Sequence, residues 1–537
     1  IVISDDVDEP WENIIQSTSN NIADLITSNK PFFNAKKILS DAYSQETSSG
    51  GERYPEVRSQ IINGIKKGAL VVNYFGHGGE DGLARERIFN KIDAAEISNE
   101  KLNCFVSVTC EFTKFDNPNR ETAGEFLYWN KNGGSVALIT TTRQIFVSVG
   151  VDFNLTLENY LFSLNSNSYT SMAEALRLTK IDPSISNSDQ RRLVFFIGDP
   201  AMKLPIPEPQ INITKINNIP VEEFNSNIRG LDLVNIKGEV QNLDGTLIND
   251  YQGELTATVF DKEIQRSTIG NDGTTDNQGN PILLNFKSIG EMLFRGKSSV
   301  NDGEFEFNFV IPKDVGMEID FGKFSFYSKN DNSSFDNNGY NLSILIGGIN
   351  ENAEEDNIGP EIQMFMNDET FISGGITNEN PNLIVKFFDE NGINTSSGIG
   401  HDIIATLDYD QSKSYVLNEY YQANLDDYKN GTLTFPLNNI SSGTHILTLK
   451  AWDVHNNSSE TEIEFTVFDQ DQELVIENVL NYPNPFVDYT EFWFNHNSSS
   501  PLNVTIQVFT ISGKLVKTIL GTTESFGNNS FSRDFFW

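Results

Sequence analysis

Residues 69–79 read Ala-Leu-Val-Val-Asn-Tyr-Phe-Gly-His-Gly-Gly, an apolar run that ends in a glycine-rich turn. A short apolar run bounded by such a turn is typical of a buried strand. The same pattern recurs along the first 206 residues, where β-rich runs are separated by stretches with helical periodicity. The predicted strands cover residues 1–4, 35–39, 69–75, 104–109, 135–142 and 193–197.

Helices are predicted between these strands. The amphipathic stretches with a 3.6-residue period lie at residues 14–26, 57–65, 122–132 and 171–180. Thr122 and Glu125 open the third stretch with the spacing of a capping box. Strands that alternate with helices predict an α/β domain at residues 1–206, in which helices cover both faces of a mostly parallel sheet.

The rest of the chain has a different pattern. From about residue 210 the helical periodicity ends, and short alternating strands recur between Gly, Asn and Asp turns. This pattern is typical of all-β, immunoglobulin-like sandwiches. Proline-rich and acidic segments separate the predicted modules, which cover residues 210–348, 358–468 and 472–537. We interpret both ends of the sequence as cut, so that the last module is expected to be truncated.

The charge of the protein excludes some partners. The formal net charge of the 537 residues is −37, with 75 acidic and 38 basic side chains. Nucleic-acid phosphates and anionic membrane surfaces would be repelled by such a chain. We therefore expect no nucleic-acid partner.

A histidine and a cysteine follow two of the predicted strands. His77 comes just after strand 69–75, and Cys110 just after strand 104–109. Catalytic groups gather at the carboxyl ends of the strands in parallel α/β sheets. The second cysteine, Cys104, is roughly 20 Å from Cys110 if one strand joins them, which is too far for a disulfide. We expect Cys104 to lie in the core.

The pair matches the chemistry of a cysteine peptidase. An imidazole stabilises the reactive thiolate and then protonates the leaving amine. The N–H groups of Gly78 and Cys110 are candidates for an oxyanion hole. Each residue alone has a structural explanation, as a buried small side chain or a histidine in a turn. Their joint position at one sheet edge favours catalysis.

The other candidate residues have weaker signals. Asp5 and Asp6 end the first strand, where either carboxylate could orient His77, cap the next helix or face water. Arg143 could bind a substrate carboxylate or pair with an acidic loop. The Asp- and Asn-rich loops 271–280 and 329–339 resemble calcium sites only loosely, and turn formation explains them better. We expect the protein to require no cofactor, and the sequence leaves open whether it binds calcium.

The motifs resemble those of the gingipain family of cysteine peptidases. The similar segments are Val71–Gly78, Phe105–Cys110, Gly133–Arg143 and Phe196–Pro200. The resemblance implies a caspase-like α/β fold, with His77 as general base and Cys110 as nucleophile. The family's third, acidic residue falls on Asp6 by position, although gingipains tend to carry glutamate there.

Within that family, the chain is most similar to the sortases of the type IX secretion system of Bacteroidota. The segment Asn481-Tyr-Pro-Asn-Pro-Phe486 is similar to the start of type IX sorting domains. The resemblance implies an enzyme at the outer-membrane surface that removes C-terminal sorting signals from cargo proteins and attaches the cargo to anionic lipopolysaccharide. Outer-membrane shuttle and attachment-complex proteins are the other implied partners. The alternatives are a secreted gingipain-like endopeptidase and a catalytically inactive surface scaffold or adhesin.

Overall fold

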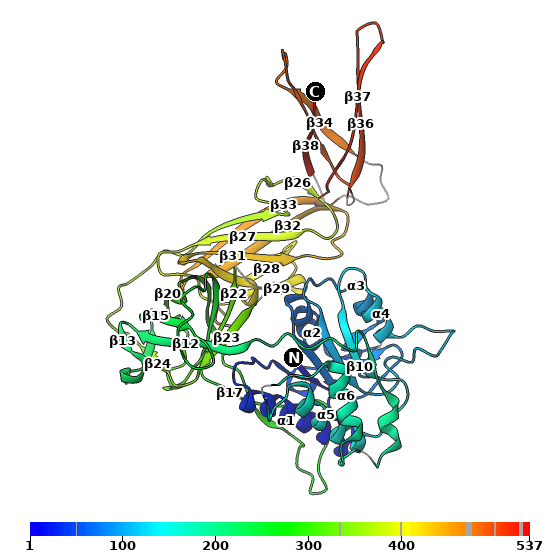
Figure 1. Ribbon diagram of the computed structural model, residues 1–537, viewed down its shortest axis with the longest axis vertical. Coiled ribbons are helices and arrows are strands. Elements are labelled where there is room, and N and C mark those ends of the chain that lie inside the picture. Colours follow the sequence, from blue (N-terminus) through cyan, green and yellow to red (C-terminus); the bar gives the residue numbers. More distant parts are fainter. Residues whose placement is uncertain are drawn as a thin grey trace. The chain divides into compact units, whose positions relative to one another are not determined.

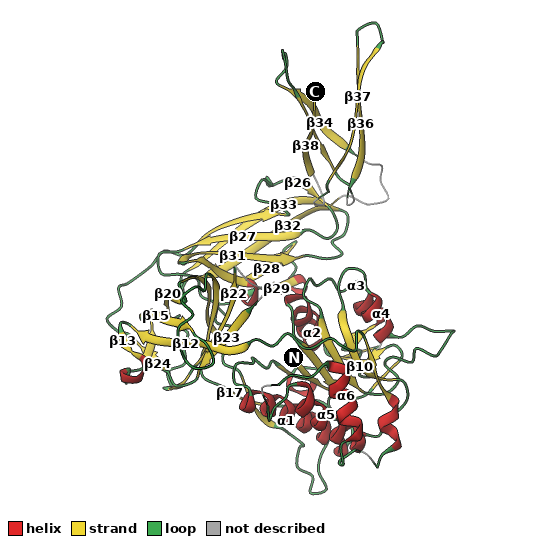
Figure 2. Ribbon diagram, viewed as in Figure 1, coloured by secondary structure: helices red, strands yellow, loops and turns green. Residues whose placement is uncertain are grey.

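The structure is a computed structural model that describes residues 1–49, 51–166, 168–185, 187–331, 335–397, 400–467, 475–498, 501–525 and 530–537. It contains two compact units. The first comprises residues 1–209 and 262–290, and the second comprises residues 210–261 and 291–537. All α-helices of the described residues lie between residues 13 and 181; Figure 2 draws these helices in red, together with short 3-10 helices of both units. None of these helices has the length and apolar character needed to cross a membrane.

A six-stranded sheet forms the centre of the first unit. Its order is β11-β10-β9-β5-β1-β2. The strands are β1 (Val2–Ser4), β2 (Lys37–Leu39), β5 (Val71–Phe75), β9 (Asn103–Val108), β10 (Ser135–Thr141) and β11 (Val194–Ile197). Only the β10–β11 pair of this sheet is antiparallel. The predicted mostly parallel sheet is therefore confirmed.

Helices cover both faces of this sheet (Figure 1). One core contains side chains of α1 (Asn13–Asn29), α5 (Val147–Leu161) and α6 (Met172–Ile181). The other contains side chains of α2 (Pro55–Lys67), α3 (Lys91–Glu96) and α4 (Ala123–Trp129). Consecutive strand residues serve opposite faces, because Val71 lies in the first core and Val72 in the second. Burial on both faces explains why these strands are apolar without alternation.

Of the six α-helices in the described residues, four were predicted, whereas α3 and α5 were not. At the start of α4, the Glu125 carboxylate accepts a hydrogen bond from the Thr122 N–H at 2.8 Å, as expected for a capping box. Helix α5 begins Val-Ser-Val-Gly-Val, and β-branched residues and glycine have low helix propensity. Its buried residues Phe153 and Leu157 pack into the core, so tertiary contacts stabilise this helix.

The second unit begins with an all-β module. Its strands pair in the order β16-β22-β23-β12-β15-β20-β19, and β19 also pairs with β16, so the ladder closes on itself. The strands are β12 (Glu208–Ile216), β15 (Leu233–Val240), β16 (Gly253–Phe260), β19 (Met292–Asn301), β20 (Glu304–Val310), β22 (Lys323–Asn330) and β23 (Asp336–Asn341). Shorter strands add to this module: β13 (Ile219–Pro220), β14 (Ile228–Gly230), β21 (Asp320–Phe321) and β24 (Leu345–Ile349).

A second β module and a β-rich tail follow. One sheet continues through β30 (Tyr421–Leu425), β31 (Asp427–Pro436), β27 (Asn382–Phe388) and β25 (Glu361–Met366). The other contains β26 (Gly375–Thr377), β33 (Ser458–Val467), β32 (Gly443–Trp452), β28 (Ile404–Leu407) and β29 (Ser414–Val416), and the two share one core. The tail contains β34 (Ile476–Tyr482), β35 (Glu491–His496), β36 (Leu502–Phe509), β37 (Leu515–Thr523) and β38 (Ser530–Phe536). The predicted boundary between these parts, at residues 468–472, lies outside the described residues.

Residues 262–290 leave the first β module between β16 and β19 and pack with the α/β unit instead. They contain the paired strands β17 (Ile264–Ser267) and β18 (Asn285–Ser288). Phe286 is 3% exposed and lies in the same core as α2. The sequence analysis placed this segment in the 210–348 module, because alternating strands identify an all-β pattern without indicating which core the segment joins. We call residues 262–290 the inserted hairpin.

Candidate active site

His77 and Cys110 occupy equivalent positions beyond two neighbouring strands. Phe75 of β5 is paired in register with Val108 of β9, and each candidate residue follows its strand by two positions. Adjacent strands lie about 4.8 Å apart. The Thr109 hydroxyl donates a hydrogen bond to the Gly76 carbonyl at 2.6 Å, which joins the two loops directly. The histidine and the cysteine are therefore brought to one edge of the sheet.

Gly78 belongs to a small hairpin that follows His77. The strands β6 (Gly78–Gly79), β7 (Gly82–Leu83) and β8 (Phe89–Asn90) form it. The Ala84 N–H donates to the His77 carbonyl at 2.9 Å, so the next pair along the ladder, Gly78 with Leu83, is a non-hydrogen-bonded pair. The Gly78 N–H therefore points away from Leu83. A Cβ on Gly78 would lie 2.7 Å from the Thr109 hydroxyl oxygen, so only glycine fits here.

Glu12 contacts the imidazole of His77. Its Oε1 atom is 2.7 Å from Nε2 of the ring, and its other oxygen accepts a hydrogen bond from the Glu9 N–H at 2.7 Å. Burial raises the pKa of the Glu12 carboxyl, but its hydrogen bonds to His77 and Glu9 outweigh burial, and the pKa lies below its usual value. An ionised Glu12 favours the tautomer with the proton on Nε2, which leaves the lone pair on Nδ1.

The structure places Asp5 and Asp6 elsewhere. The Asp5 Oδ2 atom accepts a hydrogen bond from the His77 backbone N–H at 2.7 Å, and Asp6 Oδ2 accepts one from the Tyr54 hydroxyl at 2.8 Å. The carboxylate at the His77 ring is thus that of Glu12, where the sequence analysis expected Asp6. Glu12 ends a short 3-10 helix, Pro10–Glu12, that turns the chain back toward the sheet edge. The gingipain family's preference for glutamate was the signal that could have identified Glu12. The number of residues in the turn that brings Glu12 to the sheet edge cannot be predicted from the sequence.

The two cysteines have different surroundings. Both thiols are free; Cys110 is half-buried, with its Sγ 4.0 Å from the Ile145 carbonyl oxygen. Cys104 is 1% exposed and belongs to the core beside α5, as expected, and burial raises the pKa of its thiol. The chain turns sharply after Cys110, where Glu111 has a φ of 53° in the left-handed region.

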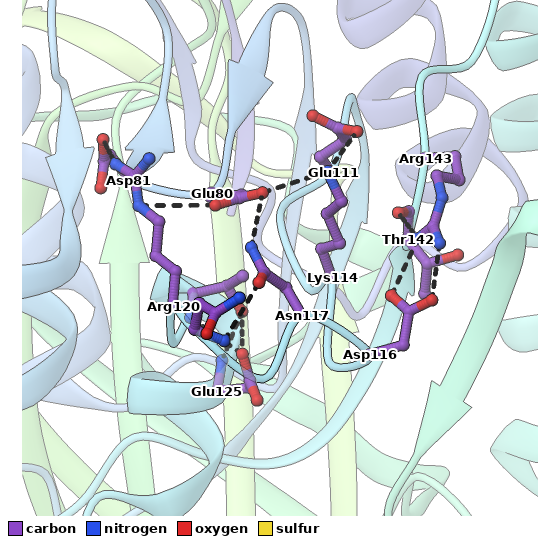
Figure 3. A network of polar contacts seen from close by, with 12 residues as sticks. Glu80, Asp81, Glu111, Lys114, Asp116, Asn117, Arg120, Glu125, Thr142 and Arg143 are labelled. Atoms are coloured by element: carbon purple, nitrogen blue, oxygen red, sulfur yellow. Dashed lines mark hydrogen bonds and ion pairs between the residues drawn. The ribbon is translucent and has the colours of Figure 1, made fainter.

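A polar network connects the loop after Cys110 with the β6–β7 turn (Figure 3). The Lys114 ammonium lies 3.1 Å from Glu80 and 3.0 Å from Glu111. Arg120 pairs with Glu80 at 3.4 Å and also with Asp81. These ion pairs hold together the two loops that carry Cys110 and Gly78.

Arg143 follows the adjacent strand β10 by two positions and pairs with the same loop. Its guanidinium forms a two-point contact with Asp116, at 2.9 and 2.6 Å, which Figure 3 also shows. The sequence analysis gave this pairing with an acidic loop as one of two alternatives for Arg143. Binding of a substrate carboxylate, the other alternative, stays a prediction and requires the contact with Asp116 to break.

The loops considered for calcium have local explanations as far as they are described. The Asp276 carboxylate accepts hydrogen bonds from the N–H groups of Gln278 and Asn280, which makes it part of a turn. In loop 329–339, residues 332–334 lie outside the described residues.

A family model matches the part of the chain that carries this site. The model of peptidase family C25, the gingipain family, matches residues 1–205. Residues 1–205 thus form a C25 peptidase domain. The members of this family are cysteine peptidases. No curated protein matches the chain.

Several solved structures are similar to parts of this chain. Dimeric latent PorU from Porphyromonas gingivalis is 27% identical, with 76% of this chain and 38% of that chain covered and a TM-score of 0.33. The Arg-specific cysteine proteinase gingipain R is 16% identical, with 62% of each chain covered and a TM-score of 0.30. The complex of P. gingivalis RgpB pro- and mature domains is 15% identical, with 62% and 63% covered and a TM-score of 0.30. The chain thus spans well under half the length of the PorU structure.

Proposed function

We propose that the C25 domain cleaves peptide bonds with Cys110 as nucleophile and His77 as general base. The observation that carries the proposal is the equivalent position of the two residues beyond paired strands, together with the contact between His77 and the buried Glu12. A thiol beside an imidazole whose second nitrogen is held by a carboxylate is the arrangement of cysteine and serine peptidases.

In the first step, the Cys110 thiol transfers its proton to Nδ1 of His77, and the thiolate attacks the carbonyl carbon of the scissile peptide. The tetrahedral intermediate collapses to a thioester as the C–N bond breaks, and the imidazolium gives its proton to the leaving amine. Water or an acceptor amine then attacks the thioester, and the thiol of Cys110 is restored. Glu12 keeps the imidazole oriented and stabilises its positive charge between these transfers.

The oxyanion of the intermediate needs hydrogen-bond donors. We assign this role to the N–H groups of Gly78 and Cys110, at the ends of the two strands. The register of the β6–β7 pair supports the assignment, because the Gly78 N–H points away from Leu83. Such donors typically lower the barrier by about 3–4 kcal/mol.

The proposed biological role is that of a PorU-like sortase. The enzyme would act at the outer-membrane surface, remove C-terminal sorting signals from type IX secretion cargo and join the new carboxyl end to anionic lipopolysaccharide. The support is the sequence itself, in which the C25 motifs occur in one chain with β modules and the Asn481–Phe486 segment. Outer-membrane shuttle and attachment-complex proteins are the proposed partners.

Replacement of the nucleophile tests the catalytic proposal. In cells that lack the wild-type protein, Cys110→Ala should leave cargo with its C-terminal signal attached and unanchored. The matched control is Cys104→Ala, which removes the buried thiol beside α5 and should retain processing. An irreversible thiol-directed peptide inhibitor should label Cys110 and spare Cys104. Normal processing by Cys110→Ala would favour the inactive scaffold and contradict the proposal.

The acceptor of the thioester separates the sortase from a secreted endopeptidase. The purified protein is incubated with a peptide that carries a sorting signal, with and without an amine acceptor. A sortase yields a cargo–acceptor amide in proportion to acceptor concentration. Purely hydrolytic products at every acceptor concentration would support the endopeptidase alternative and leave the nucleophile assignment intact.

A further inference from the structure

The inserted hairpin reaches the loop that leads from β1 to Glu12. The Thr274 hydroxyl oxygen lies 2.8 Å from the Val7 carbonyl oxygen and 3.1 Å from the Asp8 carbonyl oxygen. A carbonyl oxygen only accepts hydrogen bonds, so the hydroxyl is the donor in both contacts. Val7 is 4% exposed, and Thr274 is half-buried. A side chain 266 positions further along the chain than Asp8 thus holds this loop.

One peptide plane links this contact to His77. The Asp8 carbonyl and the Glu9 N–H belong to the same planar peptide unit, so they cannot move independently. The Glu9 N–H donates to Oε2 of Glu12 at 2.7 Å, and Oε1 of Glu12 is 2.7 Å from Nε2 of His77. The Glu12 N–H also donates to the Glu9 carbonyl at 2.9 Å. The contacts therefore form one chain from the Thr274 hydroxyl through Glu9 and Glu12 to the imidazole.

The hairpin is itself fixed beside this loop. The Asn271 side-chain amide donates to the Asp41 carboxylate at 3.1 Å and to the Tyr43 carbonyl at 3.0 Å, and the Asn271 N–H donates to the same carboxylate at 3.0 Å. The Ile269 N–H donates to the Asp41 carbonyl at 2.7 Å. Asp41 is 1% exposed, and Phe286 lies in the core beside α2. The segment that presents the hydroxyl is thus held by several contacts of its own.

The two loops that the hairpin contacts lie at the same edge of the sheet. β1 and β2 are parallel neighbours in which Ser4 pairs with Leu39, and the loops after them carry Val7 and Asp41. The carboxyl ends of parallel strands meet at one edge. In the strand order β9-β5-β1-β2, the hairpin therefore lies on the side of His77 away from Cys110.

We propose that Thr274 is a positioning residue for catalysis, which acts through the Asp8–Glu9 peptide to fix the Glu12 carboxylate against His77. The inference rests on the proposed function, because it concerns the same histidine. Hydrogen bonds in series polarise one another and restrict the groups that they join. An imidazole held by a fixed carboxylate is oriented for proton transfer, and a small displacement of such a group is costly. A segment inserted between β16 and β19 of the first β module thus contributes to the peptidase reaction.

Removal of the hydroxyl tests the proposal. Thr274→Val keeps the shape of the side chain and should lower kcat for a sorting-signal peptide by roughly 3- to 10-fold, the effect of one neutral hydrogen bond, without a change in KM. Thr274→Ser, which retains the hydroxyl, should restore the wild-type kcat. The matched control is Thr275→Val, at the exposed neighbouring threonine. Equal kcat values for Thr274→Val and Thr275→Val would overturn the proposal.

Coupling to Glu12 separates positioning from a general loss of structure. In a Glu12→Gln background, Thr274→Val should lower kcat by less than about 2-fold, because the carboxylate that the hydroxyl positions is already gone. A purely structural defect would instead lower kcat by the same factor in the wild-type and Glu12→Gln backgrounds. That outcome would contradict the positioning role.

A measurement without turnover distinguishes a failure of this inference from a failure of the proposed function. Hydrogen exchange at the Glu9 and Glu12 amides should be at least about 3-fold faster in Thr274→Val than in the wild type, and unchanged in Thr275→Val. Exchange at the wild-type rate in Thr274→Val would refute the inference even in an active peptidase. If Cys110→Ala retains peptidase activity, the proposed function fails, and the exchange rates still decide whether Thr274 holds Glu12 in place.

Discussion

The Glu12 carboxylate lies 2.7 Å from Nε2 of His77. The other ring nitrogen, Nδ1, is the one that carries the lone pair. Glu12 is 1% exposed, and the Glu9 N–H holds its second oxygen in place. A carboxylate this well fixed orients the imidazole and selects its tautomer. Three of the predictions below concern this edge of the sheet and the elements that support it.

The first prediction concerns Glu12 itself. Glu12→Gln should lower kcat/KM for a peptide substrate by roughly 10²- to 10⁴-fold, because an amide does not enforce the same tautomer. The control is Glu9→Gln, a neighbouring exposed position whose backbone N–H is retained. Because the pKa of Glu12 is lowered in the folded protein, the stability from this contact is present above pH 4.5 and is lost as the pH falls below it. Unchanged kinetics in Glu12→Gln would refute its positioning role.

The second prediction concerns the glycines after His77. Gly78→Ala should reduce kcat by at least about 10-fold, since its methyl group meets the Thr109 side chain at 2.7 Å and displaces a proposed oxyanion donor. Gly79→Ala is the matched control, because a Cβ at this position has no neighbour within 4 Å. Steady-state kinetics of both variants would check this. Equal rates for the two variants would show that the Gly78 position is not critical.

The third prediction concerns a buried carboxyl that supports the strand leading to His77. The Asn73 amide donates to Glu158 of α5 at 2.7 Å, and burial raises the pKa of Glu158 to about 7. Stability from this group is full below its usual pKa of 4.5 and is lost as the pH rises to about 7. Glu158→Gln should therefore stabilise the α/β unit at pH 8, by up to about 3 kcal/mol, and have little effect at pH 4. Denaturant unfolding at both pH values measures this; a gain that is independent of pH would contradict it.

The fourth prediction concerns the inserted hairpin. Phe286→Ala should destabilise its contact with the α/β unit by about 3–5 kcal/mol, because the ring is 3% exposed within the core beside α2. Limited proteolysis should then cleave residues 262–290 much faster than in the wild type. Leu283→Ala is the control on the same hairpin, since Leu283 is 47% exposed. If both variants are cleaved at the wild-type rate, the hairpin does not depend on this core.

Much of the site could be located from the sequence, because strand ends are local features. The runs before His77 and Cys110 are apolar and end in turns, so both residues could be assigned to the carboxyl edge of a parallel sheet. The capping box of Thr122 and Glu125 could also be predicted from the sequence, since its contacts lie within four residues. Cys104 was assigned to the core because it lies inside an apolar strand.

Only the tertiary structure decided which carboxylate meets His77 and which core the inserted hairpin joins. Glu12 and His77 are 65 positions apart in the chain, and residues 262–290 pack against side chains more than 200 positions earlier. Such contacts depend on turn geometry and on the packing of distant segments, which no local pattern of side chains encodes. Hydrophobic periodicity in the sequence determined where the strands and helices lie and where they end. The path of the chain between these elements determined which side chains contact His77 and the inserted hairpin.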